Sequence, residues 1–486
     1  MLTETDRIGS YQLSRDNRCI HLSRQNIAGQ EDMLDNIFLL TVDALGARHV
    51  GFLGYDRNTT PHLDELAKQG IQCQVGVAQS SHTRESMPSL FYSAYPFQLG
   101  EVGPVPDDRP TITTELRNAG YTTAGFHSNP YLSRAYGFDR GFDTFDDALP
   151  LAKNRVFTFI HRAINHFRLQ PYTRAEDLNA KGLDWIDTTT SDRRFLWLHY
   201  MDPHGPYQPS DNVQQLFRDE MIGRREAKKL WRRTVDEPET ITEEERQTLI
   251  DLYDAEIRYT DEAIGAFIDE LETRELLDSS LIIMTADHGD AFGEHGIYGH
   301  PRQLYEELIH VPLLMIVPDG SSAQITQPIE NIDIGPTILQ MIDQDIPTEF
   351  EGSPIKYTSN TTADSARLTT RSPDAEHSGS DPAAFAEAHG ESDNVGVDRF
   401  VIRTGEYKYL VEIGPDGIVE TRRLFDLSDD LGERTDIQAE FPDVRTRLDN
   451  RLLQHINEVK STAVNTDGPS EVDAVVEDRL DDLGYK

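Results

Sequence analysis

The chain has 486 residues, of which 37% are hydrophobic and 8% aromatic, with 33 glycines and 25 prolines. This composition excludes collagen-like, fibrous and wholly disordered proteins, and the length allows a large α/β domain with a smaller second one. Acidic residues outnumber basic ones by 85 to 46, which gives a formal net charge of −39 and a surface that repels phosphate backbones and anionic lipids. We therefore expect no nucleic-acid partner.

Lysine and cysteine are both scarce. Only nine of the 46 basic residues are lysines. We interpret this strong acidity with few lysines as adaptation to high salt, in a halophilic protein; an ordinary acidic protein would more often keep its lysines. Cys19 and Cys73 are too few for a disulfide framework and lack metal-type spacing. No apolar leader and no run of about 18 apolar residues occurs, so we expect a cytoplasmic protein without a membrane span.

Short apolar runs, rich in β-branched residues, predict buried strands. Helical patterns separate them, and this alternation predicts an α/β fold with a largely parallel, doubly wound sheet. In such a sheet, ligands bind beyond the carboxyl ends of the strands. The predicted strands are residues 37–42, 121–126, 195–200, 281–286 and 312–317, and the predicted helices are residues 60–69, 111–119, 177–188 and 242–277.

The second half of the chain contains two stretches of unusual composition. Residues 210–245 are charged and helical, which predicts an excursion over one face of the domain. Residues 357–395 are rich in Ser, Thr, Asp, Ala and Gly and show no periodicity. Residues 399–403, 407–412 and 420–425 then predict a small antiparallel sheet, followed by a helix around 444–459. The domains expected are an N-terminal extension (1–35), the main α/β domain (36–355), a low-complexity connector or loop (356–398), and a small α+β subdomain with an acidic tail (399–486).

Polar residues follow several of these strands directly. Asp43 ends the first strand, where a carboxylate suits a hard metal ion, although such a residue is more often a cap or a loop partner. Asp287 and His288 follow the strand 281–286, with Gly289 beside them to permit close backbone approach. The alternative is a polar cap with solvent-facing histidines, but the density of ligand-type residues favours a metal site. The same loop continues with Asp290, Glu294, His295, Tyr298 and His300.

Two further segments carry reactive side chains. His199, Asp202 and His204 lie near the end of the strand 195–200, in HYMDPHGPY. Residues 80–90, SSHTRESMPSL, form a hydroxyl-rich turn that opens a helix, which offers a nucleophile and backbone N–H groups for an anion. Taken alone, this turn is better explained as an ordinary N-cap by Ser81 or Thr83.

Considered together, these segments resemble the sulfatase family of the alkaline-phosphatase superfamily, over about residues 36–355. The resemblance implies a catalytic domain that is an α/β/α sandwich with a large mixed, mostly parallel sheet. It also implies a small C-terminal domain with an antiparallel sheet. Its carriers are NIFLLTVDAL, GYDRNTTPHLDELA, SLFYSAYP, AGYTTAGFHSNPYLSRAYGFDRGFDTFDD, HYMDPHGPY, TADHGDAFGEHGIYGHPRQLYEELIHVPLL and LFDLSDDLGERTDI.

The resemblance also implies roles for individual residues. One divalent cation, Ca²⁺ by resemblance with Mn²⁺ or Mg²⁺ as alternatives, would be bound by Asp43, Asp287 and His288, with the nucleophile as a further ligand. His204 and His300 match positions that contact the transferred group or assist the leaving oxygen. Asn129 falls in a substrate-contacting segment, although its surroundings depart from the family pattern.

The sequence departs from the family at the nucleophile. The family's C-x-P-x-R or S-x-P-x-R motif, whose Cys or Ser becomes formylglycine, aligns Thr83 with the nucleophile, Glu85 with the Pro and Met87 with the Arg. A rival register places Ser86 there but breaks the spacing to the Tyr-Pro that follows. Threonine cannot become formylglycine because its Cβ carries a methyl group. Ala44 stands where many relatives carry a second Asp, and no lysine occurs between residues 231 and 354.

Three functions follow from this reading. The first is a metal-dependent hydrolase of sulfate or phosphate esters in which Thr83 is the nucleophile, acting on a small-molecule or glycan substrate. The second is a phosphoryl or phosphodiester transferase, or a phosphonate or phosphodiester hydrolase, of the same superfamily. The third is a catalytically degenerate protein that binds a glycan or another anion.

Overall fold

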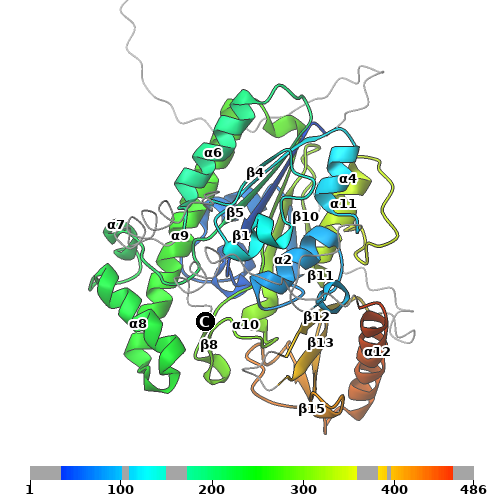
Figure 1. Cartoon of the computed structure of the whole chain (residues 1–486). Helices are drawn as coiled ribbons and strands as arrows, with labels where there is room; N and C mark the ends of the chain where they lie inside the picture. The colour runs from blue at the N-terminus through cyan, green and yellow to red at the C-terminus, as the bar shows by residue number, and fades with distance from the viewer. Residues whose placement is uncertain (1–33, 101–108, 149–171, 358–380, 391–395, 464–486) are drawn as a thin grey trace, which may run out of the picture. The chain divides into compact units, whose positions relative to one another are not determined.

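A mixed β-sheet forms the centre of the main domain in the computed structural model, which describes residues 34–100, 109–148, 172–357, 381–390 and 396–463 (Figure 1). Within those residues the sheet has nine strands in the order β10-β2-β9-β6-β1-β5-β3-β4, with β11 also paired to β2. The predicted α/β class is confirmed. The strands are β1 (Asn36–Val42), β2 (Ile71–Val77), β3 (Thr122–Phe126), β4 (Thr144–Asp146), β5 (Arg194–Tyr200), β6 (Ser280–Ala286), β9 (His310–Ile316), β10 (Ala323–Ile325) and β11 (Ile329–Glu330).

Helices cover both faces of this sheet because side chains alternate along each strand. Ile37 and Leu39 of β1 pack on one side, while Phe38, Leu40 and Val42 pack on the other. Figure 1 shows the two helical layers on either side of the strands. The first layer contains α2 (Thr83–Tyr92), α4 (Ile112–Asn118) and α11 (Ile334–Met341), and the second contains α1 (Pro61–Ala67), α6 (Ala175–Thr188) and α9 (Glu243–Thr273).

The strand directions are parallel in the middle of the sheet and antiparallel at β9. β1 pairs in parallel with both β5 and β6, and β3 pairs in parallel with β5. By contrast, β9 runs antiparallel to β6 and to β2. The sheet is therefore parallel through its centre and mixed toward the β9 side, which agrees with the sandwich that the family resemblance implied.

A second, antiparallel sheet has the order β12-β13-β14-β15. One face packs on α12 through Phe400, Tyr409 and Leu452, and the other contacts the main domain through Ala384 and Leu308. The expectation that residues 356–398 form only a connector or loop is wrong at β12. The elements are β12 (Ala383–Ala388), β13 (Asp398–Thr404), β14 (Tyr407–Ile413), β15 (Val419–Asp426) and α12 (Pro442–Ser461).

The predicted charged excursion contains α7 (Asp211–Gln214) and α8 (Arg224–Asp236), both of which contact α9. Residues 1–33, 358–380 and 464–486, which hold most of the expected extension, part of the connector and the acidic tail, lie outside the described residues. Among the helices that the structure describes, none combines the length and apolar character needed to cross a bilayer.

Candidate active site

The predicted site residues meet where four neighbouring parallel strands end. Asp43 follows β1, Asn129 lies beyond β3, His204 lies beyond β5, and Asp287 and His288 follow β6. The sheet order places these strands side by side as β6-β1-β5-β3. The carboxyl ends of parallel strands thus bring residues that are far apart in the sequence to one edge of the sheet.

Asp43 is fully buried, and its two carboxylate oxygens have different partners. Asn129 Nδ2 donates to Oδ2 at 2.7 Å, and His199 Nε2 lies 3.3 Å from the same oxygen. Oδ1 accepts no hydrogen bond from any described residue. Burial opposes ionisation, but His204, His199 and His288 outweigh it and lower the pKa of Asp43. Asp43 is therefore held as an anion with one oxygen left open.

His199 supports Asp43 through a short chain of hydrogen bonds. Trp197 Nε1 donates to Thr41 Oγ1 at 2.9 Å, and that oxygen lies 2.9 Å from His199 Nδ1. A hydroxyl that accepts from the indole can donate its own proton to Nδ1, which places the single N–H of the neutral His199 ring on Nε2, facing Asp43. His199 then acts as a donor to the carboxylate. The sequence places this residue near the site but does not reveal its role.

Asp287 and His288 complete the arrangement. Asp287 Oδ1 accepts from the backbone N–H groups of Ala44 and His288 at 3.0 and 2.9 Å, whereas Oδ2 has no hydrogen-bond partner among the described residues. His288 Nδ1 lies 2.9 Å from the Gly289 carbonyl, which can only accept, so Nδ1 carries a proton. His288 Nε2 is 3.8 Å from Asp43 Oδ1 and 3.6 Å from Asp287 Oδ2.

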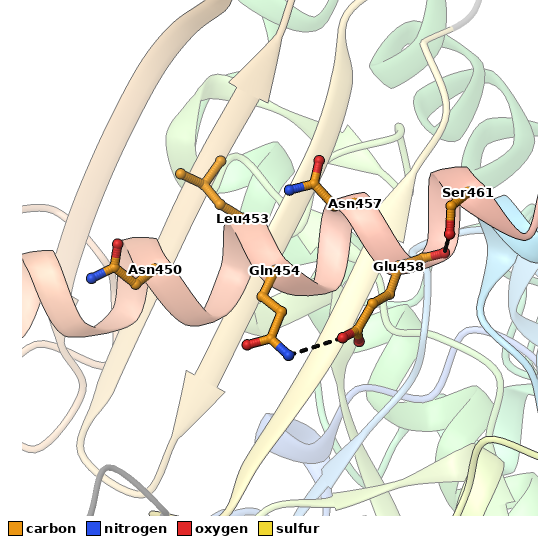
Figure 2. Close-up of a pocket in the computed structure, with 6 residues that line it drawn as sticks. All are labelled: Asn450, Leu453, Gln454, Asn457, Glu458 and Ser461. Carbon is orange, nitrogen blue, oxygen red and sulfur yellow. Dashed lines mark hydrogen bonds between the residues drawn. The ribbon is translucent and has the colours of Figure 1, made fainter.

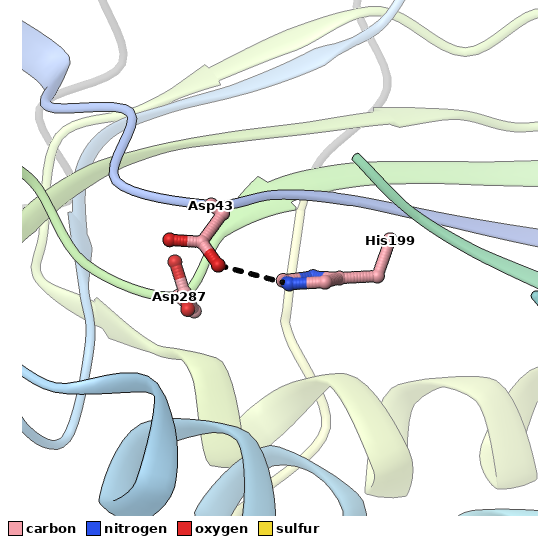
Figure 3. Close-up of side chains that lie close together, drawn as sticks. All are labelled: Asp43, His199 and Asp287. Atoms are coloured by element: carbon pink, nitrogen blue, oxygen red, sulfur yellow. Dashed lines mark hydrogen bonds and ion pairs between the residues drawn. The ribbon is translucent and has the colours of Figure 1, made fainter. Parts of the chain in front are cut away.

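These donors fit a hard divalent cation. Two buried carboxylate oxygens without hydrogen-bond partners point toward one imidazole nitrogen, and such oxygens need a positive charge nearby. Burial lowers the pKa of His288, but the charges of Asp287 and Asp43 outweigh it and raise that pKa. Figure 3 shows the Asp43 and Asp287 carboxylates together, with His199 bonded to Asp43.

Two histidines, His199 and His288, are candidates for the third ligand of a cation held by Asp43 and Asp287. Donor atoms of Asp43, His199 and Asp287 all lie within 4.8 Å of one another, so distance alone makes His199 a candidate ligand. His288 is the alternative, because its Nε2 also lies near both carboxylates. Its Nδ1 proton is engaged by a carbonyl, and its Nε2 faces the open oxygens of Asp43 and Asp287 and the Thr83 hydroxyl, whereas His199 Nε2 already lies 3.3 Å from the other oxygen of Asp43.

Thr83 lies beside this cluster. It is the first residue of α2, and its Oγ1 is 3.2 Å from His288 Nε2. The interpretation of Thr83 or Ser81 as the N-cap is wrong, because His82 is the N-cap and its side chain accepts from the Arg84 N–H. Ser86 Oγ, the rival nucleophile, is buried without a hydrogen-bond partner among the described residues.

His204, His300 and His288 lie close to one another. The ring centroid of His300 is 4.4 Å from that of His288 and 5.0 Å from that of His204. His300 Nδ1 is bonded to Asp290 Oδ1 at 2.7 Å, and Tyr207 donates to the other Asp290 oxygen. Burial and the charge of His288 lower the pKa of His300. The sequence placed Asp290 in this loop without indicating that it orients His300.

Glu85 and Met87, which align with the Pro and the Arg of the family motif, have different surroundings. Glu85 is buried and pairs with Arg302 Nε at 2.9 Å, and Ser80 donates to its other oxygen. Met87 is fully buried in the core that α2 shares with the sheet. The motif arginine thus has no counterpart at Met87, while an arginine from the His300 loop supports the first turn of α2.

A shallow hollow along α12 does not belong to this site. Figure 2 shows that its lining comes from one helix of the small subdomain. It contains none of the residues discussed above. The lining residues are Asn450, Leu453, Gln454, Asn457, Glu458 and Ser461.

Comparison with known proteins identifies the family. The family description "Sulfatase" matches residues 35–344. Arylsulfatase K of Rattus norvegicus is 32% identical over 224 residues, which is 46% of this chain and 38% of the rat protein. The chain thus matches well under half the length of that relative.

Solved structures share the fold at low identity. A protein in complex with its substrate D-glucosamine-2-N,6-O-disulfate has a TM-score of 0.64 at 18% identity, covering 90% of this chain and 100% of that one. The phosphonate monoester hydrolase of Agrobacterium radiobacter has a TM-score of 0.63 at 17% identity, covering 87% and 96%. With the family match over most of the main domain, these findings show that the chain belongs to the sulfatase family of the alkaline-phosphatase superfamily.

Proposed function

We propose that this protein is a metal-dependent hydrolase of sulfate esters, with Thr83 as its nucleophile. The observation that carries the proposal is the convergence of two open carboxylate oxygens, His288 Nε2 and Thr83 Oγ1 at one edge of the sheet. Membership of the sulfatase family supports the reaction class. The rat relative is named an arylsulfatase, and one structural neighbour takes a sulfated glucosamine, so sulfated glycans are a candidate substrate class.

The cation would be held by Asp43, Asp287 and His288, with Thr83 as a further ligand. When bound, a divalent cation polarises the ester oxygens and lowers the pKa of a coordinated hydroxyl. Oxygen-rich ligand sets suit Ca²⁺, Mg²⁺ and Mn²⁺, and we propose Ca²⁺ on the family resemblance. Asn129 and His199 fix the Asp43 carboxylate so that its other oxygen faces the site.

The Thr83 hydroxyl loses its proton to solvent water, its Oγ forms a bond to the sulfur atom, and the bond from sulfur to the leaving oxygen breaks. His204 or His300 supplies the proton that the leaving oxygen needs, and water then cleaves the Thr83 ester to release sulfate. In the first turn of α2 the N–H groups of Arg84, Glu85 and Ser86 already bond to His82, so the Thr83 N–H is the group proposed to stabilise the negative charge of the transferred group. Asn129, which bonds to Asp43, is also proposed to contact the substrate.

A second candidate is hydrolysis of phosphonate or phosphodiester substrates, or transfer of a phosphoryl group to another acceptor. It is favoured by Thr83, because an unmodified alcohol at the nucleophile position can form a phosphoryl ester, and by the phosphonate monoester hydrolase among the structural neighbours. A degenerate protein that binds anions without turnover would still show the cation-binding cluster but no product.

A substrate panel separates these possibilities. Aryl sulfate, phosphate monoester, phosphodiester and phosphonate esters are assayed at molar KCl with the metal-stripped protein, alone and with added Ca²⁺, Mn²⁺ or Mg²⁺. The proposal expects turnover of the sulfate ester that depends on metal and is lost in Asp43→Asn. Preferred turnover of a phosphorus ester supports the second candidate, and absence of any turnover with intact cation binding contradicts both.

A further inference from the structure

The helix α8 is strongly basic in an otherwise acidic protein. Its sequence, RREAKKLWRRTVD, holds six basic and two acidic residues, in a chain whose formal net charge is −39. Arg224, Arg225 and Lys229 are exposed, and Lys228 is half-buried. None of these four forms an ion pair with another residue that the structure describes. This local reversal of charge is not explained by the fold, because the buried face of α8 is formed by Ala227, Leu230 and Thr234.

α8 lies against two loops of the candidate site. A Cβ placed on Gly205, the residue after His204, would lie 2.0 Å from Trp231 Nε1, so the indole covers this loop. α8 also contacts β8 (Tyr298–Gly299), which directly precedes His300. Figure 1 shows α8 next to β8 and to the end of α9. The basic helix therefore borders both loops that carry the site histidines.

Helix geometry separates the basic residues into two flanks. Arg224 and Lys228 stand seven and three residues before Trp231, so they share its side of the helix, the side that faces the Gly205 loop. Arg225 and Lys229 each follow one of these residues, so they are rotated by 100° about the helix axis and lie toward the opposite flank. On that flank Arg233 pairs with Glu245 of α9. Within the described helix α8, Arg224 and Lys228 are therefore the cations without an ion pair on the flank that faces the Gly205 loop.

Their placement has an electrostatic consequence. A surface with a net charge of −39 repels a substrate that carries several negative charges, and the repulsion grows with the number of charges. Two unpaired cations beside the catalytic loops oppose this repulsion where the substrate approaches. They would matter little for an ester with one charge, which Thr83 and the cation site already engage.

We propose that the flank of α8 formed by Arg224 and Lys228 binds a second anionic group of the substrate, and that the substrate is a saccharide with at least two sulfate groups. This inference rests on the proposed function and adds a substrate class to it. The site cluster binds the scissile ester, while Arg224 and Lys228 bind a sulfate elsewhere on the same molecule. Basic side chains and sulfate oxygens form charge-assisted hydrogen bonds at such a surface.

The test compares two double variants that remove equal charge from the same helix. Arg224→Gln/Lys228→Gln changes the site flank, and Arg225→Gln/Lys229→Gln is the matched control on the other flank. Both are assayed with D-glucosamine-2-N,6-O-disulfate and with a singly charged aryl sulfate, at the lowest KCl concentration at which circular dichroism shows a folded protein. The binding of the disulfate to each protein is also measured by calorimetry.

We expect the site-flank variant to lower the ratio of kcat/KM for the disulfate to that for the aryl sulfate by about 3- to 10-fold, as expected for loss of two charge contacts at the protein surface. The control variant should change this ratio less than about twofold, and the difference should shrink near 1 M KCl, where the Debye length is about 3 Å. Equal ratios in the two variants would overturn the inference while leaving the hydrolase intact.

Calorimetry separates this inference from the proposed function. Weaker disulfate binding in the site-flank variant alone, without turnover of any ester by the wild type, would support the binding surface and contradict the hydrolase. Binding of phosphatidylserine vesicles or DNA by α8, with no difference between the variants toward the disulfate, would overturn the assignment to a sulfated saccharide.

Discussion

Gly289→Ala tests how closely the backbone approaches behind His288. An ideal Cβ at Gly289 would lie 2.2 Å from the Glu307 carbonyl oxygen and 3.0 Å from Gly46 Cα. Ordinary carbon–oxygen contacts are about 3.3 Å or longer, so one of these backbone segments has to move by about 1 Å. Overpacking of this kind typically costs about 1–3 kcal/mol. We expect the upper end of that range, because the clashing atoms are backbone atoms.

The displacement should reach the site, since His288 precedes Gly289 directly. A misplacement of about 1 Å in a catalytic geometry can cost about 100-fold in rate, and we expect a loss of that order together with weaker cation binding. Denaturant unfolding, calorimetric titration with Ca²⁺ and ester turnover measure the three effects. Gly405→Ala is the matched control, because a Cβ there meets no atom within 4 Å. A Gly289→Ala protein with wild-type stability and cation affinity would refute the close approach.

Three other predictions concern the surroundings of the site and the fold. Asn129→Ala and His199→Phe should each weaken cation binding by about 10- to 100-fold in calorimetry, since both remove a hydrogen bond that orients Asp43. Glu330→Gln should raise the melting temperature at pH 8. Burial and a neighbouring Asp raise the pKa of Glu330, so the stability that the protonated Glu330 contributes is lost as the pH rises through this raised pKa. The difference in melting temperature between the variant and the wild type should vanish below pH 4.5, the ordinary pKa of glutamate. The melting temperature of the wild type should rise with KCl up to molar concentrations if the charge of −39 reflects adaptation to salt.

The central strands could be predicted because they are buried on both faces. β1 and β6 read as continuous apolar runs, and their ends agree with the prediction within one residue. The carboxyl-end rule then placed Asp43, Asp287 and His288 at one edge, and the structure brings their side chains together.

Two strands, β2 of the large sheet and the edge strand β12 of the small one, were harder to predict. β2 has the sequence IQCQVGV, and its two glutamines interrupt the apolar run that would have marked it as a buried strand. It pairs with β9 in the antiparallel direction. β12, with the sequence AAFAEA, consists mainly of alanine, which has low strand propensity, and its pairing with β13 stabilises it as a strand.

Roles that depend on hydrogen bonding were not visible in the sequence. His199 and His288 are distinguished by the partners of their Nδ1 atoms, the Thr41 hydroxyl for His199 and the Gly289 carbonyl for His288. Likewise, the cap of α2 belongs to His82, although Ser, Thr, Asp and Asn are the favoured cap residues.

Turnover by three variants at the start of α2 tests the central claim most directly. Thr83→Ser keeps the hydroxyl beside His288, whereas Thr83→Val keeps the shape and removes the oxygen; Ser86→Ala removes the rival hydroxyl from the same helix. We predict that Thr83→Ser and Ser86→Ala retain metal-dependent ester turnover and that Thr83→Val loses it by at least about 1,000-fold, with cation binding still measurable. Turnover retained in Thr83→Val, or lost in Ser86→Ala, would contradict the assignment of Thr83 as the nucleophile.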